Sequence, residues 1–98
     1  MKYPDKLKIV VDFFHIGKGR QCSRTHGPIA LALRERFPKA RIIVNSHLHL
    51  ERPGIILGDA FYPHTEESKA YIEQIDDPHV FTYPNVLILW KSNKEENK

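Results

Sequence analysis

Apolar side chains occupy every odd-numbered position from Leu7 to Phe13, and polar side chains lie between them at Lys8 and Asp12. A period of two residues is typical of a half-buried β-strand, and branched and aromatic side chains favour that conformation. The alternation stops at His15, and residues 15–27 contain three of the five glycines of the chain. We therefore predict a first strand followed by a long loop that ends at Gly27.

Two later stretches have the apolar spacing of three to four residues that is typical of a helix. The first begins at Pro28, because proline is tolerated in a first helical turn, and ends near Arg36, two residues before another proline. The second follows Thr65, a good N-cap residue, and ends near residues 76–78. Two glutamates in its first turn are favoured there by the helix dipole.

Alternation returns over residues 41–50, which predicts a second strand, and residues 55–60 predict its partner. Arg52-Pro53-Gly54 lies between them. Proline suits the second position of a tight turn and glycine tolerates a positive φ at the third. These residues therefore predict a hairpin.

The last apolar stretches, residues 80–83 and 86–90, are also strand-like, and Pro84-Asn85 between them predicts either a tight turn or a bulge. The resulting order β-α-β-β-α-β indicates the α+β class, with two helices on one face of a mainly antiparallel sheet in a split βαβ-like arrangement. We expect a single domain over residues 1–90 and a disordered polar tail over residues 91–98.

Composition places the chain among ordinary globular proteins, with 41% hydrophobic and 28% charged residues in a length of 98. Its apolar runs are far shorter than the ~20 residues of a membrane-spanning helix, so we expect no membrane contact. The first residues lack the apolar core of a secretory signal. A single cysteine, Cys22, cannot form an internal disulfide. These features predict a cytoplasmic protein.

Charge is distributed unevenly along the chain. Residues 1–41 contain ten Lys/Arg and three Asp/Glu, a balance of +7, whereas residues 42–98 contain five and nine, a balance of −4. The basic half can attract an anionic partner, or the two halves can balance each other across the folded molecule. Both interpretations stay open at this point.

The most basic segment is the predicted loop before the first helix. Lys18, Arg20, Arg24 and His26 lie there, and a helix N-terminus adds unpaired N–H groups and positive potential. We predict that these four residues contact an anion or an acidic protein. Nucleic acid is the alternative partner of this segment.

Aromatic residues beyond the needs of one small core suggest protein contacts, because such side chains anchor interfaces. Residues 87–90 are also apolar enough to invite pairing with another chain if they form an edge strand, which makes a homodimer possible. The aromatic residues considered as anchors are Phe61, Tyr62, Tyr83 and Trp90.

Histidine spacing provides a candidate metal site. On a strand, His47 and His49 would project from one face roughly 7 Å apart, a separation at which two imidazoles can bind one metal. Surface histidines on a half-exposed sheet are the alternative. Cys22, close in sequence to His26, is a candidate thiol nucleophile without a recognisable local signature. We predict no cofactor and no catalytic residue.

Three segments form a pattern in a fixed order. His-Ile at 15–16 and Gly19 are followed by Pro-Ile-Ala-Leu-Ala-Leu at 28–33, then by Pro63 with a helix-like segment, and finally by an apolar segment that begins at Pro78. The pattern resembles that of small uncharacterised proteins of tailed phages and their bacterial hosts. Those proteins have a cysteine at the position of Gly27.

The resemblance implies a shared fold and a phage setting, without an activity. In kind, such a protein resembles the inhibitors that phages use against host defence systems. The resulting hypothesis is a non-enzymatic accessory protein that binds and inhibits a host protein. A nucleic-acid-binding module that uses the basic half is the first alternative, and a metal-dependent enzyme at His47 and His49 is the second.

Overall fold

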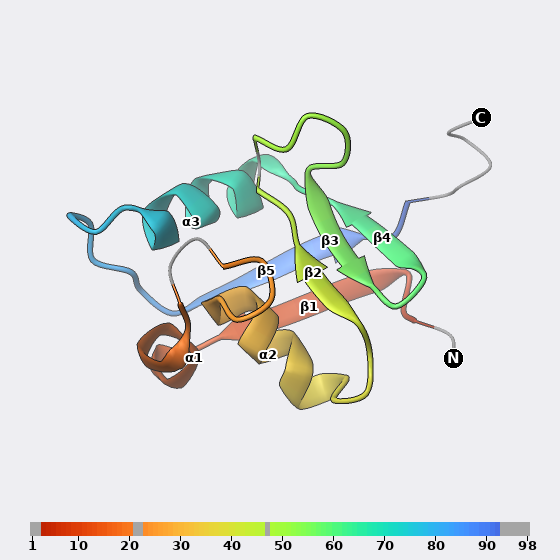
Figure 1. Ribbon diagram of the computed structural model, residues 1–98, viewed down its shortest axis with the longest axis horizontal. Helices are drawn as coiled ribbons and strands as arrows, with labels where there is room; N and C mark the ends of the chain where they lie inside the picture. Colours follow the sequence, from red (N-terminus) through yellow and green to blue (C-terminus); the bar gives the residue numbers. More distant parts are fainter. Residues whose placement is uncertain (1–2, 21–22, 47, 93–98) are drawn as a thin grey trace.

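The first and last strands of the fold pair with each other. The computed structural model describes residues 3–20, 23–46 and 48–92. Strand β1 (Lys6–Val11) runs antiparallel to β5 (Asn85–Trp90), and we refer to the pair as the β1–β5 ribbon (Figure 1). Successive side chains of a strand point to opposite faces, so only every second residue of the ribbon is buried. The buried residues are Leu7, Ile9, Val11, Leu87 and Leu89.

A second, three-stranded sheet has the order β2-β3-β4, with both pairs antiparallel. Its strands are β2 (Ile42–Val44), β3 (Gly54–Leu57) and β4 (Ala60–Pro63). A two-residue loop joins β3 to β4, and Gly58 in it has a φ of +62°, a conformation that side chains rarely adopt. A side chain at this position would also meet the ring of Tyr3.

Three helices complete the fold, and the caps of each explain where it begins. In α1 (Phe13–Lys18), the Asp12 side chain accepts hydrogen bonds from the first turn. Helix α2 (Pro28–Arg36) begins with its proline and has Gly27 as N-cap. In α3 (Glu66–Asp76), Thr65 and the serine three residues later form a capping box.

One apolar cluster holds these elements together. It lies between the inner face of the ribbon, helices α2 and α3, and the three-stranded sheet (Figure 1). Leu33 of α2, Ile55 of β3 and Leu57 of β3 are fully buried in it. The ribbon therefore forms one outer layer of the molecule, and its other face packs against nothing within the described chain.

The α+β class and the antiparallel pairing are confirmed, as are the bounds of α2 and α3. Two features differ from the prediction. The strands form two sheets instead of one, and residues 13–18 form helix α1, where the prediction had the end of a strand and a loop. The reason is local: Asp12 caps a new helix and turns Phe13 and Phe14 outward, where 59% and 60% of their surfaces are exposed.

The strand predicted over residues 41–50 is wrong in length, because β2 ends at Val44 and hydrogen-bonded turns follow. Gly54 belongs to β3 and has no positive φ, so it is not the turn residue that was predicted. The tight turn of this sheet lies instead at Gly58, between β3 and β4.

At the C-terminal end, residues 80–83 are not a strand, and Pro84 immediately precedes β5. It is therefore neither the turn of a hairpin nor a bulge. The first two residues of the predicted tail are ordered, since Lys91 N–H donates to the Asp5 carbonyl and Ser92 N–H to that of Phe61. Residues 93–98 lie outside the described part of the chain.

No helix within the described ranges is long and apolar enough to cross a membrane.

Two buried tyrosines join distant parts of the chain. The hydroxyl of Tyr62 donates to the carbonyl of Pro4 at 2.6 Å, and that of Tyr71 donates to the carbonyl of Tyr83, also at 2.6 Å. Burial raises the pKa of both hydroxyls to about 12, and the negative charge of Asp5 contributes for Tyr62. The folded chain therefore retains these two protons at pH values where the unfolded chain loses them.

We predict that alkali unfolds the protein through these tyrosines. Below pH 10 both hydroxyls are protonated in either state, but between pH 10 and about 12 only the unfolded chain ionises. The free energy of unfolding should fall as the pH rises through this window, by up to about 2 kcal/mol for each tyrosine. Urea unfolding at a series of pH values measures the slope.

The Tyr71→Phe variant should have a shallower slope above pH 10 than the wild type. The Tyr83→Phe variant is the matched control, because the Tyr83 side chain is 61% exposed and only its backbone carbonyl accepts the bond. Identical slopes for the wild type and Tyr71→Phe would contradict the assignment.

Candidate functional site

The basic loop between α1 and α2 folds back on itself. The backbone N–H of Arg20 donates to the carbonyl of His26 at 2.8 Å, and the N–H of His26 donates to Ser23 Oγ at 3.0 Å. These bonds bring both ends of the loop together immediately before Gly27, the N-cap of α2. The loop is therefore a compact extension of the helix N-terminus.

Further hydrogen bonds fasten the loop to its neighbours. Val44 N–H donates to the carbonyl of Arg24 at 2.8 Å, so the loop adds to the end of β2. The Arg24 guanidinium reaches Asn45 Oδ1 at 3.5 Å, and Arg34 of α2 donates to the carbonyl of Thr25 at 2.9 Å. Arg24 thus lies against the sheet, with part of its hydrogen-bonding capacity used there.

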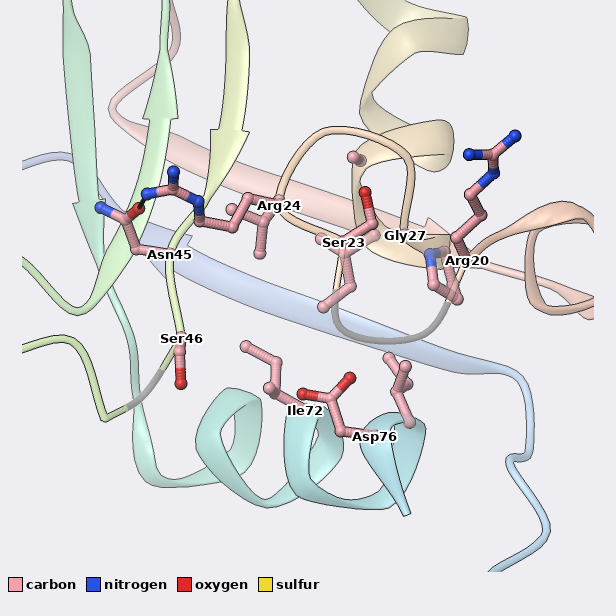
Figure 2. Close-up of a pocket in the computed structure, with 13 residues that line it drawn as sticks. Arg20, Ser23, Arg24, Gly27, Asn45, Ser46, Ile72 and Asp76 are labelled. Atoms are coloured by element: carbon pink, nitrogen blue, oxygen red, sulfur yellow. Dashed lines mark hydrogen bonds between the residues drawn. The ribbon is translucent and has the colours of Figure 1, made fainter. Parts of the chain in front are cut away.

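A pocket of about 220 Å³ opens between this loop, the first turn of α2, the end of β2 and one side of α3 (Figure 2). Its apolar wall is made by Val44, Ile72 and Ile75. Its polar rim includes Arg20, Arg24, Ser23, Ser46 and Asp76.

Charges of both signs surround the pocket. Gly27 provides no side-chain cap for α2, so the amides of its first turn and the positive end of the helix dipole lie at the pocket wall. The guanidinium groups of Arg20 and Arg24 point to opposite sides, while Asp76 faces the loop from α3 (Figure 2). This rim does not focus positive charge on one point as a phosphate site does.

The predicted binding residues are only partly brought together. Arg20 and Arg24 both line the pocket, whereas Lys18 ends α1 and neither it nor His26 is among the lining residues. The His26 side chain is exposed, with Nδ1 2.8 Å from Thr25 Oγ1. Arg20, Arg24 and His26 therefore lie on the loop and Lys18 at the end of α1, and the four residues do not form a single site.

His49 of the predicted metal pair is not on a strand, because β2 ends at Val44. His49 lies in a turn, where its Nδ1 accepts hydrogen bonds from the backbone N–H groups of Glu51 and Arg52. His47 and Cys22 lie outside the described residues. In the described ranges, no three His, Cys, Asp or Glu side chains are grouped as metal ligands.

Sequence reasoning missed the α3 side of the pocket. Ile72 and Ile75 have the spacing of a helical core face, and Asp76 is typical of a helix end. Nothing in their pattern distinguishes residues that line a pocket from residues that only fill the core. Their role becomes visible only because the fold places α3 opposite the basic loop.

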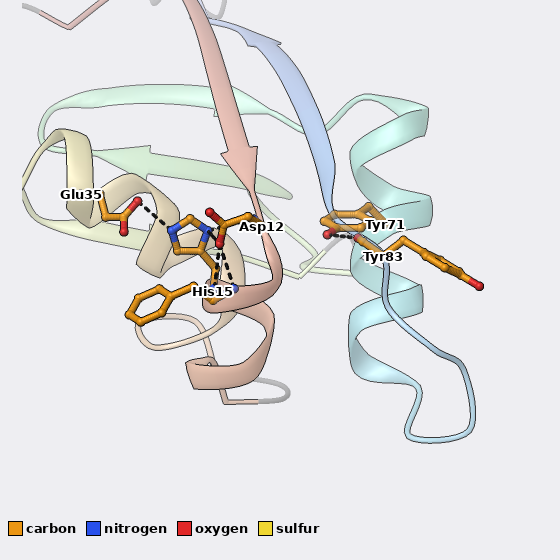
Figure 3. A network of polar contacts seen from close by, with 6 residues as sticks. Asp12, His15, Glu35, Tyr71 and Tyr83 are labelled. Carbon is orange, nitrogen blue, oxygen red and sulfur yellow. Dashed lines mark hydrogen bonds and ion pairs between the residues drawn. The ribbon is translucent and has the colours of Figure 1, made fainter.

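A buried histidine lies at the junction of α1 and α2 (Figure 3). His15 Nδ1 accepts a hydrogen bond from the backbone N–H of Asp12 at 3.0 Å, which completes the capping box of α1. Its Nε2 lies 2.8 Å from Glu35 Oε1. Since Nδ1 accepts, the ring proton is on Nε2 and is donated to the carboxylate. His15 thus has a structural role.

Comparison with known proteins adds no function. No protein-family model, no curated protein and no solved structure matches this chain. The resemblance to phage proteins therefore stays a prediction.

We predict that replacement of His15 by alanine destabilises the protein without touching the pocket. The change removes the acceptor of the Asp12 N–H and the donor to Glu35, and leaves a cavity at the junction. Loss of such buried hydrogen bonds costs about 1–3 kcal/mol. Thermal and urea unfolding measure the loss, and His79→Ala, at an exposed histidine, should stay close to the wild type. Equal stability of both variants would contradict the structural role.

Proposed function

We propose that this protein is a non-enzymatic binding protein whose pocket between α2 and α3 receives one anchor side chain of a partner protein. The observation that carries the proposal is the size and lining of that pocket. Its volume of about 220 Å³ is below the roughly 300–1,000 Å³ typical of sites for whole small molecules. A single side chain fits such a volume better than a nucleotide does.

The lining favours an apolar anchor surrounded by acidic groups. Burial of an aromatic or aliphatic side chain against Val44, Ile72 and Ile75 would remove apolar surface from water on both proteins. Arg20 and the open N-terminus of α2 would then meet carboxylates on the partner. The basic loop thereby provides orientation, and the apolar wall provides most of the affinity.

The phage resemblance supports a host protein as this partner, and inhibition of a defence-system component as the outcome of binding in the host cytoplasm. Nucleic acid is the weaker candidate for the same surface. Its backbone is read by convergent positive charges, whereas Arg20 and Arg24 diverge here and Asp76 shares their rim.

The proposal is tested by affinity capture with the tagged full chain from bacterial host lysate, with and without nuclease and at two salt concentrations, followed by mass spectrometry. The expected result is one protein captured in stoichiometric amount and unaffected by nuclease. Capture that disappears with nuclease or at higher salt would transfer the function to nucleic acid.

The role of the pocket is tested with a variant that fills it. Val44→Phe adds a ring at the apolar wall and should weaken binding of the captured protein by about tenfold or more. Val80→Phe is the matched control, because Val80 is exposed on the segment after α3 and does not line the pocket. Isothermal titration measures both affinities, and circular dichroism checks both folds. Unchanged affinity of a folded Val44→Phe variant would refute the proposed site.

A further inference from the structure

Most side chains on the outer face of the β1–β5 ribbon are apolar, although a sheet face in contact with water favours polar residues. The register pairs Lys6 with Trp90, Lys8 with Ile88 and Val10 with Val86, and the residues between these pairs are buried. These six side chains therefore share the outward side, which we call the outer ribbon face. Antiparallel sheets with one face in water normally carry polar residues on that face.

Exposure of these side chains is substantial. Val10 is 51% exposed, Val86 45%, Ile88 42% and Trp90 59%. Residues 86–90 form an uninterrupted apolar run, a pattern typical of a strand that is covered on both faces. Within residues 3–20, 23–46 and 48–92, no element covers this second face of the ribbon.

An exposed aromatic group lies beyond one end of the ribbon. Phe13 lies two residues after the end of β1, and Phe81 and Tyr83 lie four and two residues before the start of β5. The rings of Phe13 and Phe81 are 6.3 Å apart and those of Phe81 and Tyr83 4.7 Å, and each of the three side chains is about 60% exposed. Trp90 and Lys6 lie at the opposite end of the ribbon.

We propose that a second copy of this chain covers the outer ribbon face, so that two ribbons stack as a four-stranded sandwich. The positions of the charged side chains favour a second copy in one orientation. Lys6 and Lys8 are the ionisable side chains of the face, and both lie towards the Trp90 end. A two-fold axis that lies in the plane between the two ribbons, perpendicular to the strands, places the lysine end of each copy over the valine and aromatic end of the other. Like charges are then kept apart.

A lysine ammonium group near an aromatic ring makes a favourable contact. Within one chain, Lys6 Nζ already lies 5.8 Å from the centre of the Trp90 ring. In the two-fold arrangement, the lysines of one copy lie near the aromatic group of the other, and the lysine stems cover apolar surface while their ammonium groups stay in water. The face is therefore complementary to itself without any acidic residue.

The available area suits a dimer. Nine side chains that are each about half exposed present on the order of 800 Å² per chain, which is what each partner buries in an interface of standard size. This surface is formed by β1, β5 and the aromatic group, and none of its residues lines the pocket between α2 and α3. The dimer therefore goes beyond the proposed partner binding and leaves the pocket accessible.

Sedimentation equilibrium of the full chain from about 5 μM to about 500 μM tests the proposal, and the expected result is a reversible monomer–dimer equilibrium.

The decisive variant is Ile88→Glu. In the monomer the new carboxylate lies opposite Lys8, an opposite-charge pair that suits neighbouring strands, so the fold is retained. In the dimer the carboxylate is buried, and the dissociation constant should rise by about a hundredfold or more. Leu50→Glu is the matched control, because Leu50 is 99% exposed and lies outside the ribbon.

Trp90 gives an independent readout, because it is the single tryptophan of the chain and lies on this face. Its emission should shift to shorter wavelength as wild-type protein is concentrated, and should stay constant in Ile88→Glu. A monomer at every concentration, or a dimer that survives Ile88→Glu, would overturn the proposal. The Val44→Phe variant should dimerise like the wild type, so loss of partner binding and loss of the dimer are separately detectable.

Discussion

The pairing of the first strand with the last is the constraint on which the rest of the structure depends. Residues 12–84 lie between β1 and β5, and the pairing of these two strands closes the chain around one core. The inner face of the ribbon supplies five buried apolar side chains, against which α2, α3 and the three-stranded sheet pack. Hydrogen bonds from Lys91 to Asp5 and from Tyr62 to Pro4 continue the closure beyond the strands. The positions of the other elements therefore depend on this layer.

Electrostatic balance follows from that closure. The basic first part of the chain and the acidic second part meet across the pocket, where Arg20 and Arg24 lie opposite Asp76 of α3. Of the two interpretations of the charge asymmetry, balance within the folded molecule applies around the pocket, and attraction of an anionic partner stays a prediction. The opposing charges offset each other around the pocket, while the open end of α2 retains a local preference for anions.

Local signals in the sequence predicted the elements with well-marked ends, and failed where the deciding contact was unusual or distant. Pro28 and Thr65 marked the starts of α2 and α3, because each residue suits its cap position on its own. Helix α1 was missed because His15 completes its capping box, a role that glutamate or glutamine usually has. Gly58-Asp59 is also a recognisable two-residue hairpin signal, and it competes with the turn signal of Pro53-Gly54. The pocket required α3 to lie opposite the basic loop, which no local pattern encodes.

The closure of the ribbon also has a kinetic consequence. Contacts between residues far apart in sequence slow folding, since a large loop must close before they form. During synthesis β1 has no strand partner until residues 85–90 have left the ribosome, so the ribbon cannot form before then. The helices and the three-stranded sheet between the two strands can form earlier from local contacts. Assembly of this protein should therefore end with the ribbon, and premature termination within β5 should leave a chain prone to aggregation.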